Sequence, residues 1–310
     1  MKTQMTFLID IINLKPEKMK IVTTALLLMI ALNSCQFSKS VKKDLASGLL
    51  TTGDGLSCDD VYIAVNDEKV NRNTFIYGEE FVIKFNDIEG FTKENDYLFP
   101  GMKLVVTSIA GDTVLQSKDL YSEYPNGMKL SPLLLTSILS VASPMKSKGE
   151  YSLNILIWDK KGDGHFTAKL DFKVEPNENI VTSSLNVKCD EIYLYSEERA
   201  KVIPGNKIRF NENTYFIFEG LSGFTEINGM VFPGLSLKAT DNDGNVILDY
   251  PDLFSDYDDK GLAVTDFNSR VTSNFIIPAS QFKNPLHCEL IIKDKKSDAM
   301  INVKADLILE

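Results

Sequence analysis

The stretch Cys58-Asp59-Asp60-Val61-Tyr62-Ile63 decides the architecture of this chain, because it returns as Cys189-Asp190-Glu191-Ile192-Tyr193-Leu194. Four later segments also return, in the same order, at offsets that drift only from 131 residues (58 to 189) to 135 residues (159 to 294). These are Gly90-Phe91-Thr92 with Gly223-Phe224-Thr225, Phe99-Pro100-Gly101 with Phe232-Pro233-Gly234, Asp119-Leu120-Tyr121-Ser122 with Asp252-Leu253-Phe254-Ser255, and Asp159-Lys160-Lys161 with Asp294-Lys295-Lys296. Solenoid repeats are about 20–50 residues long, so a period of this length predicts a duplicated domain.

Short alternating segments predict that both copies are all-β. In residues 165–174, and again in 300–309, apolar residues alternate with polar ones, which is typical of a strand with one solvent-exposed face. A turn and another apolar run, 151–158 or 286–292, precede each of them and predict a hairpin. Further strands are expected near 60–65, 80–86, 101–109, 112–117 and 136–142, and near 191–196, 213–219, 234–240, 245–249 and 273–278.

Seven short strands in about 120 residues is typical of an immunoglobulin-like sandwich. We therefore expect two tandem immunoglobulin-like β-sandwiches related by internal duplication, at residues 52–176 and 182–310. The joint at 175–179 is polar and contains a proline, so few contacts are expected there.

Composition and charge agree with this organisation. The chain has 310 residues, 44% hydrophobic and 25% charged, which is enough for about two domains that each bury a core. The formal net charge is −10, and both copies share the acidity. A uniformly acidic surface repels phosphate backbones, so nucleic acid is not an expected partner.

The N-terminal segment carries the features of an export signal. Residues 21–32 form an apolar run, which has the length of a secretory h-region and is short for a bilayer span. Lys18 and Lys20 precede the run, and Leu32-Asn33-Ser34-Cys35 follows it. This ending resembles the lipobox of bacterial lipoproteins, in which a small residue precedes a Cys that is cleaved and acylated. A core helix is disfavoured, because the run shows no amphipathic period.

The resemblance implies a signal peptide at 1–34, with Met19 as an alternative start, and a lipidated tether at 35–51 that begins with acylated Cys35. Acylation with more than one chain implies stable membrane anchoring. Gln36 stands where lipoproteins of the enterobacterial type carry an aspartate for inner-membrane retention. The resemblance therefore implies the bacterial outer membrane, with the periplasmic or surface face left open.

The sequence contains no catalytic signature. Cys58 and Cys189 hold equivalent places in different copies, so we do not expect a disulfide between them. Cys288 lies on an apolar row and is expected to be buried. His165 and His287 lie on the polar rows of their strands, and no Ser-His-Asp or Cys-His arrangement can be assembled. We expect a protein that is not an enzyme and needs no cofactor.

The segment Asp241-Asn242-Asp243-Gly244-Asn245 has two interpretations. It resembles the start of a calcium loop, but Val246 stands at the sixth position, where an EF-hand has glycine. Asn-Asp-Gly between two strands is also a strong hairpin signal, which we favour. A looser calcium site would use Asp241, Asp243 and Asp252.

Exposed aromatic residues in the repeated loops are the candidate ligand-binding residues. The loops connect strands, and loops on a rigid sandwich are the usual place for binding. The candidates are Tyr97, Tyr121, Tyr124 and Tyr257, with Trp158 as a secondary site. The alternative is that aromatic residues of these loops fill the ends of the sandwiches.

These observations predict a non-enzymatic cell-envelope lipoprotein, whose sandwiches form a binding or scaffold module for an unknown envelope protein or glycan. A carbohydrate-binding outer-membrane lipoprotein is the alternative, since the layout resembles that of tandem-sandwich glycan-binding lipoproteins of gut bacteria. The single Trp counts against sugar binding, because indole rings are the usual platforms for sugars. A hydrolase is the third alternative.

Overall fold

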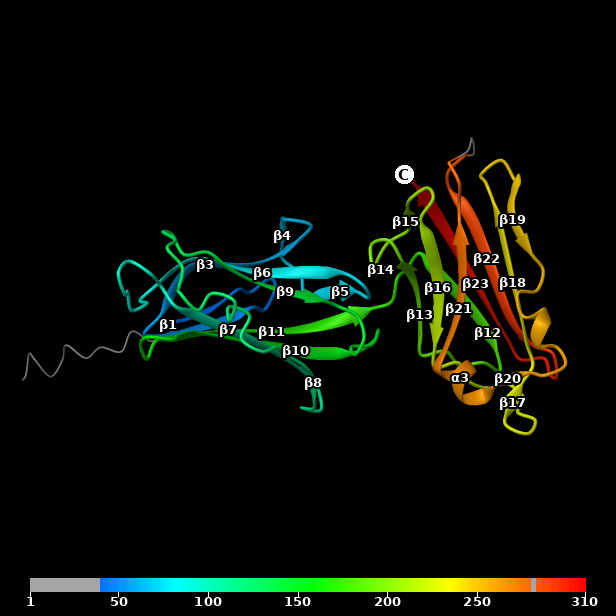
Figure 1. Cartoon of the computed structure of the whole chain (residues 1–310), viewed down its shortest axis with the longest axis horizontal. Helices are drawn as coiled ribbons and strands as arrows, with labels where there is room; N and C mark the ends of the chain where they lie inside the picture. Colours follow the sequence, from blue (N-terminus) through cyan, green and yellow to red (C-terminus); the bar gives the residue numbers. More distant parts are fainter. Residues whose placement is uncertain (1–39, 280–282) are drawn as a thin grey trace, which may run out of the picture.

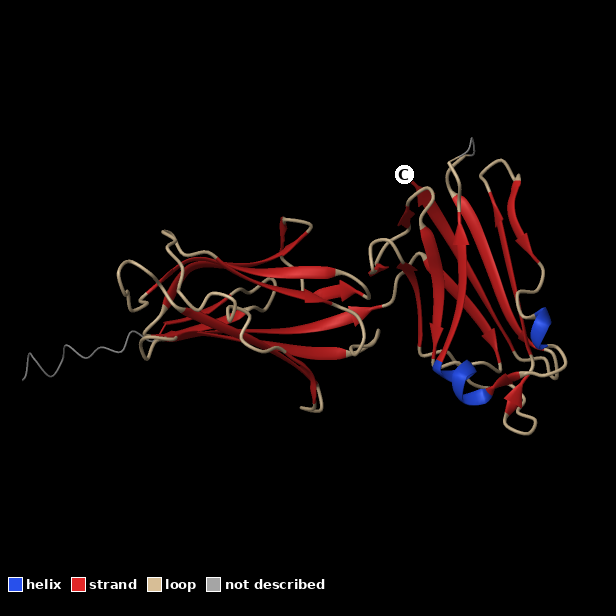
Figure 2. Cartoon of the chain, viewed as in Figure 1, coloured by secondary structure: helices blue, strands red, loops and turns tan. Residues whose placement is uncertain are grey.

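The computed structural model describes residues 40–279 and 283–310, which form an almost entirely β-structured molecule with two hydrophobic cores (Figure 1, Figure 2). The helical elements in the described part are a 3-10 turn, Ser255–Tyr257 (η1), and one short helix, Val264–Ser269 (α3). No helix there is long and apolar enough to cross a membrane. Cys35 and the predicted signal peptide lie outside the described residues.

The first eleven strands, which we call the first sandwich, form two sheets. The larger sheet has the order β1-β2-β11-β10-β7-β8, with β5 paired in parallel to β11, and the smaller has the order β4-β3-β6-β9. Their bounds are β1 (Ser40–Lys43), β2 (Leu50–Asp54), β3 (Ser57–Val65), β4 (Glu68–Val70), β5 (Thr74–Ile76), β6 (Glu80–Glu89), β7 (Pro100–Ser108), β8 (Thr113–Gln116), β9 (Leu135–Ser140), β10 (Glu150–Asp159) and β11 (His165–Glu175). The sheets pack face to face, with Phe81 5.7 Å from Phe172 and Phe85 6.1 Å from Phe166 between ring centroids.

The remaining strands form the second sandwich, whose larger sheet repeats this order apart from β1. It runs β12-β23-β22-β18-β19, with β15 paired in parallel to β23, and the smaller sheet runs β14-β13-β16-β21. The bounds are β12 (Ile180–Leu185), β13 (Glu191–Ser196), β14 (Lys201–Ile203), β15 (Lys207–Ile208), β16 (Asn213–Glu219), β17 (Met230–Val231), β18 (Pro233–Thr240), β19 (Val246–Tyr250), β20 (Leu262–Ala263), β21 (Arg270–Ile276), β22 (Leu286–Asp294) and β23 (Met300–Leu309). β17 and β20 pair with each other.

The alternation predicted for the terminal hairpins is confirmed. Leu170 on β11, and Cys288 and Leu290 on β22, are buried, whereas His165 and His287 are exposed. Both hairpins are antiparallel along their whole length. The period-2 pattern works here because the larger sheet of each sandwich has one face toward a core and one toward solvent.

The structure has more strands than the seven per copy expected from the sequence. β4, β5, β14 and β15 are two or three residues long, too short to show alternation. The expected tether also contributes structure, since β1 pairs with β2 and Leu49 is 3% exposed. Residues from Ser40 onward therefore belong to the first sandwich.

The joint between the sandwiches is packed, where the sequence suggested few contacts. The end of the first sandwich faces the flank of the second (Figure 1). Tyr193 and Ile217, on the outer face of β13 and β16, are buried in the hydrophobic cluster of the first sandwich, and the rings of Tyr77 and Tyr193 lie 5.3 Å apart. Asn177 is buried in the linker and donates hydrogen bonds to backbone carbonyls of the second sandwich.

Candidate functional site

The residues repeated in both copies meet at one end of each sandwich. In the first, Asp159 at the end of β10 is 5% exposed, and its carboxylate accepts hydrogen bonds from the backbone N–H of Thr92 (2.7 Å) and of Lys161 (3.0 Å). The next residue, Lys160, forms an ion pair with Asp119 at 2.6 Å. The Asp-Lys-Lys segment thus ties the Gly-Phe-Thr loop to the Asp-Leu-Tyr-Ser segment. We call this arrangement the motif network.

The second sandwich repeats the motif network contact by contact. Asp294 is 4% exposed and accepts hydrogen bonds from the backbone N–H of Thr225 (2.8 Å) and of Lys296 (2.9 Å). Lys295 forms an ion pair with Asp252 at 2.7 Å. Since each contact has its counterpart, the repeated motifs hold strand connections in place.

The Phe-Pro-Gly motif takes part in the same packing. The Lys161 Nζ lies 4.7 Å from the centre of the Phe99 ring. Gly101 leaves room for the predicted site residue Trp158, because a Cβ there would lie 2.1 Å from the indole Cε2. Trp158 therefore lies against the backbone of β7 and is half-buried. In the second sandwich the aliphatic part of Lys293 takes this place, 3.2 Å from the corresponding Cβ position.

The surroundings of Asp119, Asp252 and Asp294 in the motif network favour the ionised carboxylate. Burial alone would raise the pKa of Asp119, but hydrogen bonds from Lys160 and from backbone N–H groups outweigh it, so the pKa is lowered. The same balance, with Lys295 as the donor, lowers the pKa of Asp252. Burial also opposes the lowered pKa of Asp294, where Ser297 and backbone N–H groups donate. These carboxylates are suited to structural pairing, and a general base at neutral pH would need a raised pKa.

The predicted tyrosine site is only partly assembled. Tyr97 and Tyr124 are 40% and 50% exposed, respectively. Tyr121 is partly buried and its hydroxyl accepts a hydrogen bond from the backbone N–H of Thr136 at 3.0 Å. The rings of Tyr121 and Tyr124 lie 6.1 Å apart, whereas Tyr257 belongs to the other sandwich. The ligand-binding role of these residues stays a prediction.

The hairpin interpretation of residues 241–245 is confirmed, since β18 and β19 pair across them. Asp241 accepts hydrogen bonds from the backbone N–H groups of Asp243 and Asn245, both at 2.9 Å. Asp243 pairs with Lys283 at 2.8 Å, and Asp252 with the lysine of the motif network. Within residues 40–279 and 283–310, no cluster of three or more His, Cys, Asp or Glu side chains could hold a metal ion.

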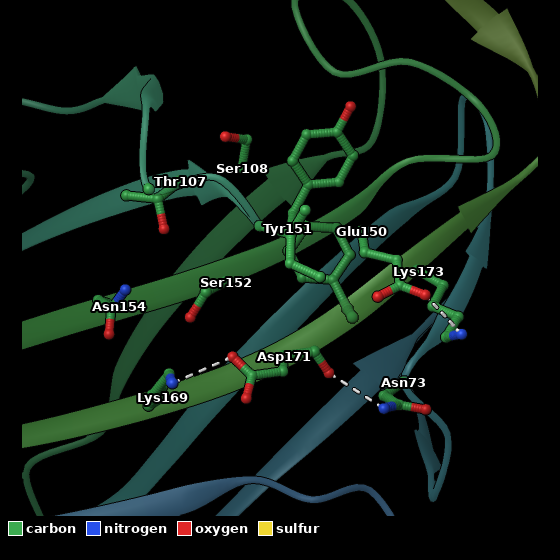
Figure 3. Close-up of a pocket in the computed structure, with 13 residues that line it drawn as sticks. Asn73, Thr107, Ser108, Glu150, Tyr151, Ser152, Asn154, Lys169, Asp171 and Lys173 are labelled. Atoms are coloured by element: carbon green, nitrogen blue, oxygen red, sulfur yellow. Dashed lines mark hydrogen bonds and ion pairs between the residues drawn. The ribbon is translucent and has the colours of Figure 1, made fainter.

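A groove that the sequence did not reveal lies on the outer face of the larger sheet of the first sandwich (Figure 3). It has a volume of about 630 Å³ and lies over β7, β10 and β11, beside the turn that leads to β8. Its polar lining residues are Asn73, Thr107, Ser108, Glu150, Ser152, Asn154, Lys169, Asp171 and Lys173. Because these residues occupy the polar rows of ordinary strands, no sequence motif marks them.

Ion pairs order the charged side chains of this groove. Lys169 contacts Asp171 at 3.2 Å and Lys173 contacts Glu150 at 2.7 Å, as Figure 3 shows. The Ser152 hydroxyl is buried and has no protein partner. The groove therefore offers both donors and acceptors, and Ile109, Tyr151 and Phe172 add apolar surface to its lining.

No family model and no curated protein matches this chain. Among solved structures it is similar to the C-terminal domain of Wzt, at 11% identity and a TM-score of 0.30, covering 44% of this chain and 78% of that one. It is also similar to pT26-6p (9% identity, TM-score 0.25, 88% and 65% covered) and to dimeric latent PorU from Porphyromonas gingivalis (14% identity, TM-score 0.23, 80% and 24% covered). At these TM-scores no functional conclusion follows from the likeness.

Proposed function

We propose that this chain is a non-enzymatic, lipid-anchored protein of the bacterial cell envelope, in which two immunoglobulin-like sandwiches form a binding or scaffold module. One observation carries the scaffold part of the proposal: the motif network recurs in both sandwiches, with Asp159 and Asp294 accepting the same backbone hydrogen bonds. The residues that both copies keep serve the fold. A duplicated scaffold explains why both copies keep these residues. A duplicated catalytic centre would instead keep groups suited to act as nucleophile, acid or base.

An internal duplication also accounts for the two larger sheets. Each has the same strand order apart from β1, and each carries one short strand paired in parallel, β5 on β11 and β15 on β23. The recurrence of this parallel pair at the same place in both sheets supports a common origin of the two sandwiches.

The lipobox-like ending at Cys35 supports the anchor. Only residues 36–39 separate Cys35 from β1, and four residues span at most about 14 Å. An acylated Cys35 would therefore keep the first sandwich beside the bilayer. The proposed location is the outer membrane, because position 36 holds Gln36 and not the aspartate that signals inner-membrane retention in lipoproteins of the enterobacterial type.

Fractionation of a Gram-negative host that expresses the full chain tests this proposal. The wild type should sediment with the outer membrane and be released by detergent but not by high salt. Cys35→Ala should lose the outer-membrane location, while Cys58→Ala, which changes a buried thiol, should keep it. A wild type in the soluble fraction, or a Cys35→Ala variant that fractionates like it, would overturn the anchor.

The groove favours carbohydrate binding as a second candidate function. Sugar hydroxyls both donate and accept hydrogen bonds, and the groove presents amide, hydroxyl, ammonium and carboxylate groups on neighbouring strands. Its volume of about 630 Å³ is within the range of ligand sites. A glycan array with residues 36–310 should find a ligand whose binding Asn154→Ala weakens and the distant, exposed Asp163→Ala does not. An array without any bound glycan, or equal binding by both variants, would sink this alternative.

A further inference from the structure

In the first sandwich an added strand completes one edge of the larger sheet. β1 pairs antiparallel with β2, from Ser40 opposite Gly53 to Lys43 opposite Leu50. The inner side of this edge is also covered, since Thr51 is 6% exposed. The outermost strand at this edge of the sheet is β1, whose sequence Ser-Val-Lys-Lys carries two positive charges.

The second sandwich lacks this cover over its described residues. β12 pairs with β23 as β2 pairs with β11, but no described strand lies on its other side. Every residue from Val181 to Leu185 is exposed, with Val181 at 64% and Leu185 at 51%. β12 therefore presents a free row of backbone N–H and C=O groups with two exposed apolar side chains.

β12 also has none of the devices that usually protect a sheet edge. Charged residues, prolines and bulges keep natural edges from pairing with other strands. The segment Val-Thr-Ser-Ser-Leu contains no charge, no proline and no glycine, and its pairing with β23 is regular. On the opposite edge of the same sheet, β19 is paired through a bulge and carries Asp249.

We propose that β12 is a self-association edge, at which two copies of this chain pair antiparallel and join their larger sheets into one. A two-fold axis beside Ser183 places Val181 opposite Leu185 of the partner subunit, and the pair occurs twice. Both apolar side chains then gain a cross-strand contact, which contributes to the stability of paired strands. An isologous contact of this kind closes on itself and gives a dimer, not a fibre.

The second copy fits this edge better than another β1 strand does. β1 is already engaged with β2, and its Lys42 and Lys43 would replace an apolar contact by a charged one. The β12 segment is uncharged and self-complementary in its own sequence. The pairing strands are short, so the dimer should be weak and should form mainly at high protein concentration.

Sedimentation equilibrium on residues 36–310, which keep every described residue, tests the proposal. The wild type should show a monomer–dimer equilibrium, and Leu185→Lys should raise the dimer dissociation constant about tenfold or more. Leu185 is exposed, so this variant should fold normally. Ser184→Pro is the second variant: Ser184 lies opposite Ile301, which pairs with β22, so its own backbone N–H faces the free edge. Val246→Lys, at a 55% exposed position on the opposite edge β19, should dimerise like the wild type.

Hydrogen exchange locates the contact. In the dimer, amides of β12 that face away from β23 should gain protection at high protein concentration. A wild type that stays monomeric, or a dimer that Leu185→Lys and Ser184→Pro leave unchanged, would overturn the proposal. The proposal would also be overturned if the protein stayed monomeric and its β12 amides gained protection only when a peptide of residues 38–45 was added. The edge would then pair with a β1-type strand and not with a second β12.

Discussion

Asp159 accepts a hydrogen bond of 2.7 Å from the backbone N–H of Thr92, a residue that lies 67 positions earlier in the chain. Asp294 accepts the equivalent bond from Thr225 at 2.8 Å. Both carboxylates are buried. If either were removed, the backbone donor would lose its partner in a place that water does not readily reach. This contact explains why Gly-Phe-Thr and Asp-Lys-Lys are kept together in both copies.

Removing the acceptor should therefore destabilise the first sandwich. We expect Asp159→Ala to lower the free energy of unfolding by about 1–3 kcal/mol, since buried backbone donors lose their partner. Urea unfolding measures this, with Asp163→Ala, an exposed position four residues on, as the control that should change stability by less than about 0.5 kcal/mol. Equal midpoints for the two variants would show that the motif network does not hold the fold.

The lowered pKa values of Asp119, Asp252 and Asp294 predict an acid limb of stability. A carboxyl whose pKa is lower in the folded chain stabilises the fold fully above its unfolded pKa, and this stability is lost as the pH falls through the folded pKa. The contribution should hold from neutral pH to near the ordinary value of 3.8 and decline below it. In urea titrations the deficit of Asp252→Asn should shrink over this acidic range. A deficit that is constant with pH would contradict the assignment.

Each sandwich should fold alone, because each has its own hydrophobic cluster. The sequence suggested residues 52–176 and 182–310 as the pieces, and β1 argues for starting the first at residue 40. Both pieces should give cooperative thermal transitions. The second should be the less soluble, since it exposes Tyr193 and Ile217. Aggregation or disorder of both pieces would mean that the two sandwiches depend on each other.

Calcium should leave the melting temperature unchanged. The Asp241 carboxylate accepts backbone hydrogen bonds of the turn, and Asp243 forms an ion pair with Lys283. Asp252 forms an ion pair with Lys295. A bound ion at a hundred times its dissociation constant would add about 2.7 kcal/mol, which thermal unfolding detects readily. A rise that Asp241→Ala abolishes would show that the turn binds calcium after all.

The long strands of this fold were predictable from the sequence. β10, β11, β22 and β23 alternate over nine to eleven residues, because each has one buried and one exposed face. The shortest strands were not predictable, because they pair through a few backbone groups and show no period. β1 was mistaken for part of a tether, since an edge strand with Lys42 and Lys43 has the composition of a linker.

The site was less accessible to sequence reasoning than the fold. The repeats of Gly-Phe-Thr and Asp-Lys-Lys were visible, but the contact between Thr92 and Asp159 depends on how the sheets bring distant segments together. Their joint recurrence at a nearly constant spacing was the available signal. The groove left no such signal, because Ser152 and Asn154 occupy an ordinary polar row of β10.

The central proposal, a lipid anchor at Cys35, is tested most directly by metabolic labelling with a palmitate analogue in a bacterial host that expresses the full chain. The wild type should incorporate the label and Cys35→Ala should not. Cys58→Ala should be labelled like the wild type, because that thiol is buried and its pKa is raised by burial to about 11. An unlabelled wild type, or a Cys35→Ala variant that still carries the label, would contradict the anchor.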